Sequence, residues 1–294
     1  MRGAFLLLVL LITAGCASLA PQRATPDTFT LWQLPEQGKT QMMSYVVRTA
    51  GGQIVVIDGG TRREAQHLRK FLRRLGGQVD LWFITHPHFD HVGAVTELLR
   101  QSGSVEIGQL YAALLPAEWY VENASADEAG MVRAFRLAAR QAGEEILTPS
   151  LGQELTLDGL RIDILGVANP EIVTNAINNS SMVLRLSDRA KSVLFFGDLG
   201  TEGGDKLLQG PYRDRLPSDY VQMAHHGQDG VGRDVYVAVA PHACLWPTPR
   251  WLWENDRGGG PGSGPWKTLE VRRWMEELGV TRHYRMGDGL QRVE

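Results

Sequence analysis

Residues 85–91 read Thr-His-Pro-His-Phe-Asp-His, which places three imidazoles and one carboxylate within six residues. They follow an apolar run over residues 79–85, a predicted buried strand, and precede a helix expected over residues 93–100. His86 and His88 point the same way if the turn is extended. Imidazole and carboxylate groups suit zinc, and four of them at the end of a buried strand are costly unless something binds them. The segment therefore predicts a metal site.

Apolar patterning along the rest of the chain alternates between strands and helices. Residues 43–49 and 53–57 form a predicted hairpin, and residues 62–75 form a predicted helix that ends at two glycines. Ser125 and Glu128 form a predicted capping box, which begins a helix that reaches about residue 142. Further strands are expected over residues 154–157, 160–165, 182–186, 192–196 and 220–224. This order predicts two packed sheets with helices outside, an α/β sandwich.

The motif His86-x-His88-x-Asp90-His91 resembles the signature of the metallo-β-lactamase superfamily. It follows a strand that ends at Asp58, where this family keeps a buried aspartate. The resemblance implies a four-layer αββα sandwich, with residues 29–294 forming one hydrolase domain. It also implies that His86, His88, Asp90 and His91 bind metal. Asp58 is then expected behind the ligands, where it fixes a ligand histidine or the loop.

Two later strand ends match further positions of this family. Residues 194–198 read Leu-Phe-Phe-Gly-Asp, and the resemblance implies that Asp198 bridges two metal ions. Residues 224–227 read Ala-His-His-Gly, where the family places its last ligand. His225 is the first choice for this ligand, and His226 is either the ligand instead or a proton donor or substrate contact. Asp90 and His226 are the candidate catalytic residues.

The chain departs from the family at one ligand, because no histidine lies between residues 92 and 224. One expected site contains His86, His88 and Asp198, which leaves a position for water, and the other contains Asp90, His91, Asp198 and His225. The expected cofactor is therefore one or two Zn²⁺ ions, with Mn²⁺ as an alternative.

Candidate substrate contacts lie in two further segments. Asn178, Asn179 and Ser180 belong to a run that resembles, together with the Gly-Asp and His-His-Gly motifs, the hydrolase domain of ComEC-like competence proteins. These side chains can donate hydrogen bonds to a substrate, although Asn and Ser also favour turns. Trp246 begins a segment rich in Pro and Trp, which forms either a wall of the cleft or a packing layer on the sheet edge. Cys244 is expected as a buried thiol rather than a ligand, so lactam hydrolysis is not favoured.

The first residues have the pattern of a secretory signal, in which Arg2 precedes an apolar run over residues 4–12. Gly15-Cys16 resembles a lipobox, so residues 1–15 are expected to be removed, Cys16 lipidated, and residues 16–28 left as a tether to the membrane. Cleavage after Ala20, which releases a soluble protein, and an uncut anchor over residues 3–20 are the alternatives. All three possibilities place the domain outside the cytoplasm, and lipidation at Cys16 predicts a lipoprotein of the cell envelope.

Composition narrows the class of protein further. Two cysteines cannot form a Cys-rich zinc module, and a formal net charge of −3 argues against an extended nucleic-acid surface. The favoured function is a zinc-dependent hydrolase of the cell envelope, whose metal-bound hydroxide attacks a phosphodiester or another ester, small or polymeric. An extracellular nuclease of the competence type and a non-catalytic metal-binding module are the alternatives. The sequence does not predict the particular substrate or the oligomeric state.

Overall fold

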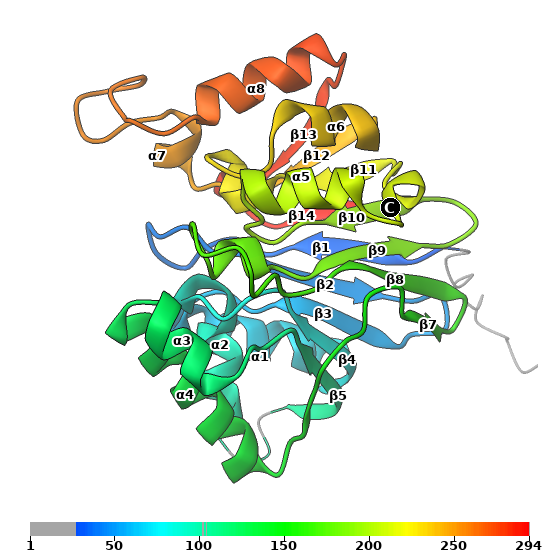
Figure 1. The fold of residues 1–294 in the computed structure, drawn as a ribbon. Helices are drawn as coiled ribbons and strands as arrows, with labels where there is room; N and C mark the ends of the chain where they lie inside the picture. The colour runs from blue at the N-terminus through cyan, green and yellow to red at the C-terminus, as the bar shows by residue number, and fades with distance from the viewer. Residues whose placement is uncertain (1–27, 102, 104, 294) are drawn as a thin grey trace, which may run out of the picture.

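The computed structural model describes residues 28–101, 103 and 105–293. Two seven-stranded β-sheets lie face to face, and helices cover the outer face of each sheet (Figure 1). The predicted signal segment, Cys16 and most of the tether lie outside the described residues, so those assignments stay predictions. Within the described ranges, no helix is both long and apolar enough to cross a membrane.

The first sheet combines the N-terminal strands with one strand from the C-terminus. Its order is β14-β1-β2-β3-β4-β5-β6. The strands are β1 (Thr30–Gln33), β2 (Ser44–Arg48), β3 (Ile54–Asp58), β4 (Gln78–Ile84), β5 (Glu106–Ala112), β6 (Ile146–Leu147) and β14 (Gln291–Val293). The predicted hairpin is confirmed as β2 and β3, which pair antiparallel. Strands β3, β4 and β5 run parallel, so their C-terminal ends meet at one edge of the sheet.

The second sheet has the order β13-β12-β11-β10-β9-β8-β7. Its strands are β7 (Glu154–Leu157), β8 (Leu160–Gly166), β9 (Val183–Ser187), β10 (Ser192–Phe195), β11 (Tyr220–Gln222), β12 (Ala243–Trp246) and β13 (Arg282–Arg285). Strands β7 to β10 are antiparallel, whereas β10 to β13 are parallel. The C-terminal ends of β10 and β11 therefore lie side by side.

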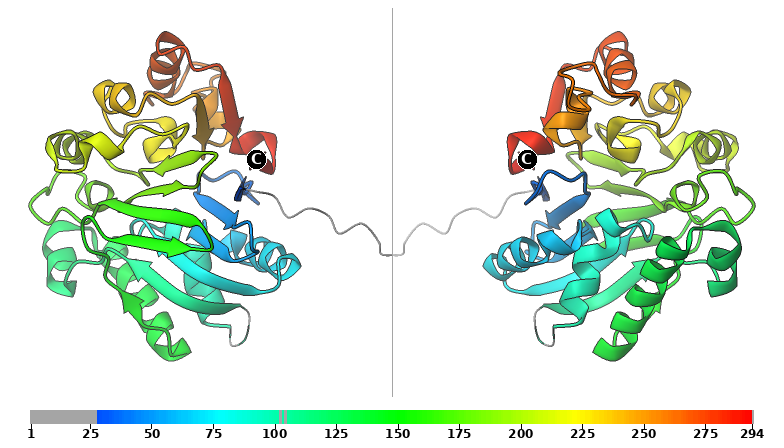
Figure 2. Two further views of the ribbon diagram at one scale, coloured as in Figure 1. Left: turned by 90° about the vertical axis from the view of Figure 1, so that its right-hand side faces the viewer. Right: turned by 90° about the vertical axis from the view of Figure 1, so that its left-hand side faces the viewer.

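Three layers of apolar side chains hold the four layers of structure together. Phe83 of the first sheet and Phe195 of the second belong to the core between the sheets. Helices α1 (Ala65–Arg74), α2 (Phe89–Leu99) and α4 (Ala126–Ala142) pack on the outer face of the first sheet. Helices α5 (Thr201–Gln209), α6 (Arg233–Val239) and α8 (Thr268–Glu277) pack on the outer face of the second (Figure 2). This arrangement confirms the predicted αββα sandwich.

The remaining helical segments are short. They are α3 (Ala117–Asn123), α7 (Arg250–Trp253) and the 3₁₀ turns η1 (Arg62–Glu64), η2 (Asn178–Ser180), η3 (Arg213–Arg215), η4 (Ala224–Gly227) and η5 (Met286–Asp288). The helix predicted over residues 62–75 is thus divided, because Thr61 caps η1 and α1 begins only afterwards. The capping box at the start of α4 is confirmed. The Ser125 side chain accepts a hydrogen bond from the Glu128 N–H, and the Glu128 side chain accepts one from the Ser125 N–H.

Helix α2 begins four residues earlier than the sequence pattern predicts. His88 has extended backbone angles and is its N-cap, and the His88 carbonyl accepts hydrogen bonds from the backbone N–H groups of His91 and Val92. Asp90 and His91 therefore lie in the first helical turn rather than in a loop. This start fixes both side chains to the rigid end of a helix.

Candidate metal centre

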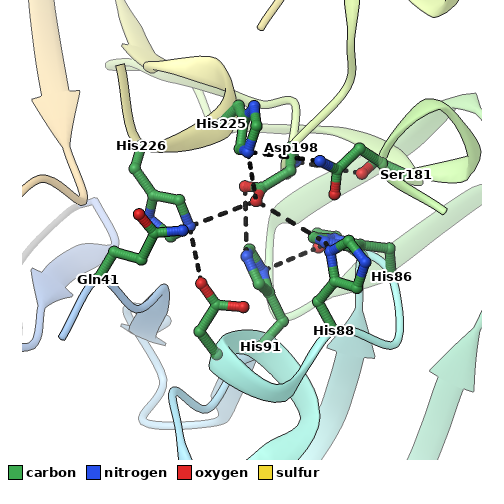
Figure 3. A network of polar contacts seen from close by, with 12 residues as sticks. Gln41, His86, His88, His91, Ser181, Asp198, His225 and His226 are labelled. Atoms are coloured by element: carbon green, nitrogen blue, oxygen red, sulfur yellow. Dashed lines mark hydrogen bonds and ion pairs between the residues drawn. The ribbon is translucent and has the colours of Figure 1, made fainter. Parts of the chain in front are cut away.

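The predicted metal-binding side chains gather where the C-terminal ends of strands from both sheets meet (Figure 3). His86 and His88 follow β4, Asp198 follows β10, and His226 follows β11. Residues more than 130 positions apart in the sequence are thereby brought together. Open α/β sheets commonly bind their ligands at such carboxyl ends of strands.

Asp58 lies behind the centre, as the sequence predicts. Its carboxylate accepts hydrogen bonds from the backbone N–H and the hydroxyl of Thr85, both at 2.7 Å. The same carboxylate lies 2.7 Å from Nδ1 of His91. Asp58 is fully buried and has a φ of 55°, so the backbone turns sharply at the end of β3 to present it. Asp58 thus fixes both the loop and the ring of His91.

The glycine of the Gly-Asp motif brings Asp198 close to the first histidine cluster. Gly197 has a φ of +58°, and a Cβ atom on it would lie 2.8 Å from the side chain of Thr85. Only glycine allows this approach without strain. The Asp198 carboxylate then lies between the rings, with Oδ1 3.2 Å from His91 Nε2 and Oδ2 3.3 Å from His226 Nε2.

Two overlapping groups have the spacing that a metal ion requires. One contains His86, His91 and Asp198, and the other contains Asp90, His91 and His226. The ligand atoms within each group lie within 4.8 Å of one another, and all of these residues are buried. His88 Nδ1 lies 3.0 Å from His86 Nε2, which extends the first group toward α4.

The histidines of the centre share one pattern of hydrogen bonding. Each ring has one nitrogen held by an oxygen outside the centre, and its other nitrogen faces inward. The outer contacts are His86 Nδ1 to Thr85 Oγ1, His88 Nε2 to Glu128 Oε1, His91 Nδ1 to Asp58 Oδ2, His225 Nδ1 to the Asp229 carbonyl, and His226 Nδ1 to the Pro247 carbonyl. Such contacts fix the tautomer, so that lone pairs are presented to a ligand ion.

Several inward atoms make no well-aligned hydrogen bond among the described residues, and their nearest polar neighbours, at 3.2–3.3 Å, belong to the same cluster. They are Asp90 Oδ2, His91 Nε2, Asp198 Oδ1 and His226 Nε2. Buried polar groups in native proteins are almost always satisfied, and a cluster of unsatisfied ones calls for a specific explanation. All four are nitrogen or carboxylate ligand types that zinc accepts. The residues present therefore fit a bound metal ion.

Electrostatics at the centre favour a cation. Burial acts to lower the pKa of His91, but the carboxylates of Asp198 and Asp58 outweigh it and raise that pKa well above its usual value. Burial likewise opposes charge on His226, yet Asp198 and Asp90 raise its pKa to about 9. The buried carboxylates thus draw positive charge into the centre, and a divalent ion would supply that charge in place of protons.

The structure places His226 rather than His225 beside Asp90 and His91, which differs from the first choice made from the sequence. His226 is fully buried and lies 3.2 Å from Asp90 Oδ2, whereas His225 is partly exposed and lies 3.9 Å from Asp198 Oδ2. Both residues have left-handed backbone angles, with φ values of 49° and 56°. This tight turn directs the two adjacent rings to different sides of Asp198.

The predicted substrate contacts separate into one residue at the centre and three framework residues. Asn178 Nδ2 lies 3.4 Å from His225 Nε2, and its buried Oδ1 has no hydrogen-bond partner among the described residues. Asn179 is fully buried and bonds to the Thr174 carbonyl, Glu202 and the Gly203 N–H. Ser180 Oγ accepts from the Asn169 N–H. Of the two alternatives for Asn179 and Ser180, these contacts favour the turn over the substrate contact, because their polar atoms complete the loop.

Trp246 is also a framework residue, not a substrate contact. It is fully buried, its indole N–H lies 3.0 Å from His283 Nδ1, and its ring packs edge-on against Trp253 at 5.0 Å. The neighbouring Cys244 is a free, buried cysteine, as predicted. Trp251 instead reaches the loop that precedes β2, where its indole N–H donates to the Lys39 carbonyl at 2.9 Å.

One residue of the centre was missed as a site residue. Glu128 was recognised from the sequence only as part of a capping box, yet its Oε1 lies 3.2 Å from His88 Nε2. No spacing signal connects the two, because they lie 40 positions apart in the sequence.

The layered fold and its cluster of histidines and aspartates define a class of αββα metal-binding proteins. The sequence profile of the metallo-β-lactamase superfamily matches residues 38–229, which is more than half of the chain. The chain therefore belongs to the metallo-β-lactamase superfamily. No curated protein matches it with significant sequence similarity.

Solved structures show the same fold at low sequence identity. The metallo-β-lactamase fold protein YhfI from Bacillus subtilis is 11% identical with a TM-score of 0.56, and the match covers 91% of this chain and 100% of that one. CmlA, a diiron β-hydroxylase from Streptomyces venezuelae, is 12% identical with a TM-score of 0.54, and the match covers 92% of this chain and 55% of CmlA. Yeast PDE1 is 10% identical with a TM-score of 0.51, covering 87% and 96%.

Proposed function

We propose that this protein is a zinc-dependent hydrolase of the cell envelope that cleaves a phosphodiester or another ester. One observation carries the proposal: the inward nitrogens and carboxylate oxygens of the centre converge on one another in a buried cluster, while the outer ring nitrogens are held by oxygens outside it. A site that had lost its metal would have no reason to keep five histidines held in this way. The envelope location rests on Cys16 and its apolar leader.

We assign the ligands to two ions that share Asp198. Donors on a tetrahedral zinc ion, with bonds of about 2.0–2.1 Å, lie roughly 3.3 Å apart. His86 Nε2 lies 3.0 Å from His88 Nδ1 and 3.8 Å from Asp198 Oδ2, and His225 Nε2 lies 3.9 Å from that oxygen. These spacings support one ion held by His86, His88, Asp198 and His225. The other ion is then held by Asp90, His91, Asp198 and His226.

This assignment accounts for the absence of a histidine between residues 92 and 224. His225 supplies the third imidazole from the other side of Asp198. Asn178 Nδ2 lies 3.4 Å from His225 Nε2 at the edge of the centre, a contact that an ion bound to Nε2 would replace, and the Asn178 Oδ1 can accept a hydrogen bond from a bound water or substrate. Asp90 is both a ligand and the candidate group that accepts a proton from the attacking water.

A pair of divalent ions, when bound by these residues, would make a water molecule nucleophilic near neutral pH and would polarise the phosphoryl or carbonyl oxygen under attack. The protein residues supply the geometry for this chemistry. Asp58 and the Pro247 carbonyl fix the rings of His91 and His226, so neither ring reorients during the reaction. Their burial also keeps bulk water away from the charged groups.

The substrate class is tested with three probes offered to zinc-loaded protein: bis-p-nitrophenyl phosphate, an aryl carboxylic ester and single-stranded DNA. We expect turnover of the phosphodiester or the ester, and none by the His88→Ala variant. Cleavage of DNA alone would favour the competence-type nuclease instead. An absence of turnover on all three probes, with zinc confirmed in the protein, would favour a non-catalytic metal-binding module.

The two adjacent histidines are expected to differ in their effects on metal binding. His225→Ala removes one ligand of the first ion, and His226→Ala removes one ligand of the second. Each variant should therefore lower the zinc content by about one ion per chain, and the double variant by about two. Zinc per chain after dialysis, measured by elemental analysis, checks this. Unchanged zinc in His225→Ala would remove His225 from the ligand set, and His242→Ala, which alters an exposed histidine, is the control.

A further inference from the structure

Glu128 contacts both the start of α4 and a ring of the metal centre. Its Oε2 accepts a hydrogen bond from the Ser125 N–H at 2.7 Å, and its own N–H donates to Ser125 Oγ at 3.2 Å. Its other carboxylate oxygen, Oε1, lies 3.2 Å from His88 Nε2. The His88 side chain is 17% exposed and that of Glu128 33%, so the contact is partly shielded from water.

The two oxygens of the Glu128 carboxylate make separate contacts, one to the helix cap and one to His88. The capping box requires only one acceptor for the Ser125 N–H, and Oε2 fills that role. Oε1 is not needed for the cap. Because the backbone N–H of Ser125 holds Oε2, the carboxylate is oriented with Oε1 at His88.

A carboxylate beside Nε2 determines which nitrogen of His88 binds metal. An ionised carboxylate only accepts hydrogen bonds, so Nε2 carries the proton of the neutral ring. The lone pair is then on Nδ1, which is the nitrogen 3.0 Å from His86 Nε2. Without the Glu128 carboxylate, this acceptor no longer holds the proton on Nε2, and either tautomer of the ring is available.

We propose that Glu128 is a positioning residue for the metal centre, which holds His88 with Nδ1 directed at the first ion. This inference rests on the proposed metal binding and extends it to α4. Strand β3 holds the ring of His91 through Asp58, and α4 holds that of His88 through Glu128. The start of α4 thereby sets the affinity of the first ion as well as the stability of the helix.

Two variants separate positioning from capping. Ser125→Ala removes the hydroxyl of the cap and leaves the Glu128 carboxylate and His88 unchanged. Glu128→Asp keeps a carboxylate in the first helical turn but is one methylene too short to reach His88 from the same backbone. We expect Glu128→Asp to bind the first zinc about 10- to 100-fold more weakly, as for other partners behind a metal ligand. Ser125→Ala should bind it within about 3-fold of the wild type.

The measurement is zinc competition with a chromophoric chelator on the full exported chain, together with the visible spectrum of the cobalt-substituted protein. Glu128→Asp should alter the spectrum and Ser125→Ala should not. Wild-type affinity and spectrum in Glu128→Asp would overturn the inference, as would equal losses in the two variants. Turnover is not used in this test, so a wild-type protein that binds zinc without cleaving any substrate contradicts the hydrolase proposal and leaves this inference intact.

Discussion

Replacing Asp198 with alanine is expected to release both metal ions and to lower phosphodiester turnover by more than about 100-fold. This carboxylate lies within 4 Å of the inward nitrogens of His86, His91, His225 and His226. Losing a partner behind a metal ligand already costs roughly 10- to 100-fold in affinity or activity. The loss of a ligand that both ions share should exceed that.

Isothermal titration with zinc, followed by an assay at saturating metal, measures the effect of Asp198→Ala. Asp205→Ala is the matched control, because it removes an exposed carboxylate from the nearby helix α5. Two zinc ions bound to Asp198→Ala with wild-type affinity would show that Asp198 does not bridge them. A loss of binding in Asp205→Ala as well would point to general destabilisation.

Substituting Gly227 with alanine should destabilise the turn that presents His225 and His226. Gly227 has a φ of +76°, and a Cβ atom on it would lie 2.4 Å from the ring of Trp246. Trp246 is fully buried, so its ring cannot yield without disturbing the core. Overpacking and left-handed backbone each cost about 1–3 kcal/mol, and we expect a loss of at least that size in the free energy of unfolding.

Chemical denaturation of the metal-free protein gives this free energy directly, and zinc content reports the damage to the centre. Gly232→Ala is the control, because no atom lies within 4 Å of its added Cβ and its backbone is not left-handed. Gly232 is the N-cap of α6, so we expect Gly232→Ala to lose no more than about 1 kcal/mol, the usual cost of alanine at that position. An equally stable Gly227→Ala would show that the turn tolerates a side chain, contrary to the packing described here.

The sequence predicted the layers of the fold because most strands either are apolar on both faces or alternate clearly between apolar and polar residues. Residues 54–57 and 193–195 are apolar runs whose side chains are all buried. Strand β5 was missed for the opposite reason, since its first four residues are exposed or only partly buried and include Glu106 and Gln109. The start of α2 was predicted four residues late, because Asp90 and His91 replace the usual apolar pattern in its first turn.

The residues of the centre were predictable from the sequence where they lie close together along the chain or at the end of a clear strand. His86, His88, Asp90 and His91 lie within one turn and its helix, and the ends of β10 and β11 indicate where Asp198 and the paired histidines join them. The choice between His225 and His226 depends on two consecutive left-handed residues, which the sequence pattern does not reveal. The burial of Trp246 and the contact of Glu128 with His88 depend on distant packing. These features required the structure.

The most direct test of the proposed hydrolase is a zinc titration of chelator-treated protein, with hydrolysis of bis-p-nitrophenyl phosphate and of an aryl ester followed at each addition. We expect no turnover without metal, a rise with added zinc, and saturation at about two ions per chain, in keeping with two ions that share Asp198. Turnover that survives metal removal, or two bound ions without turnover of either substrate, would contradict the proposed function.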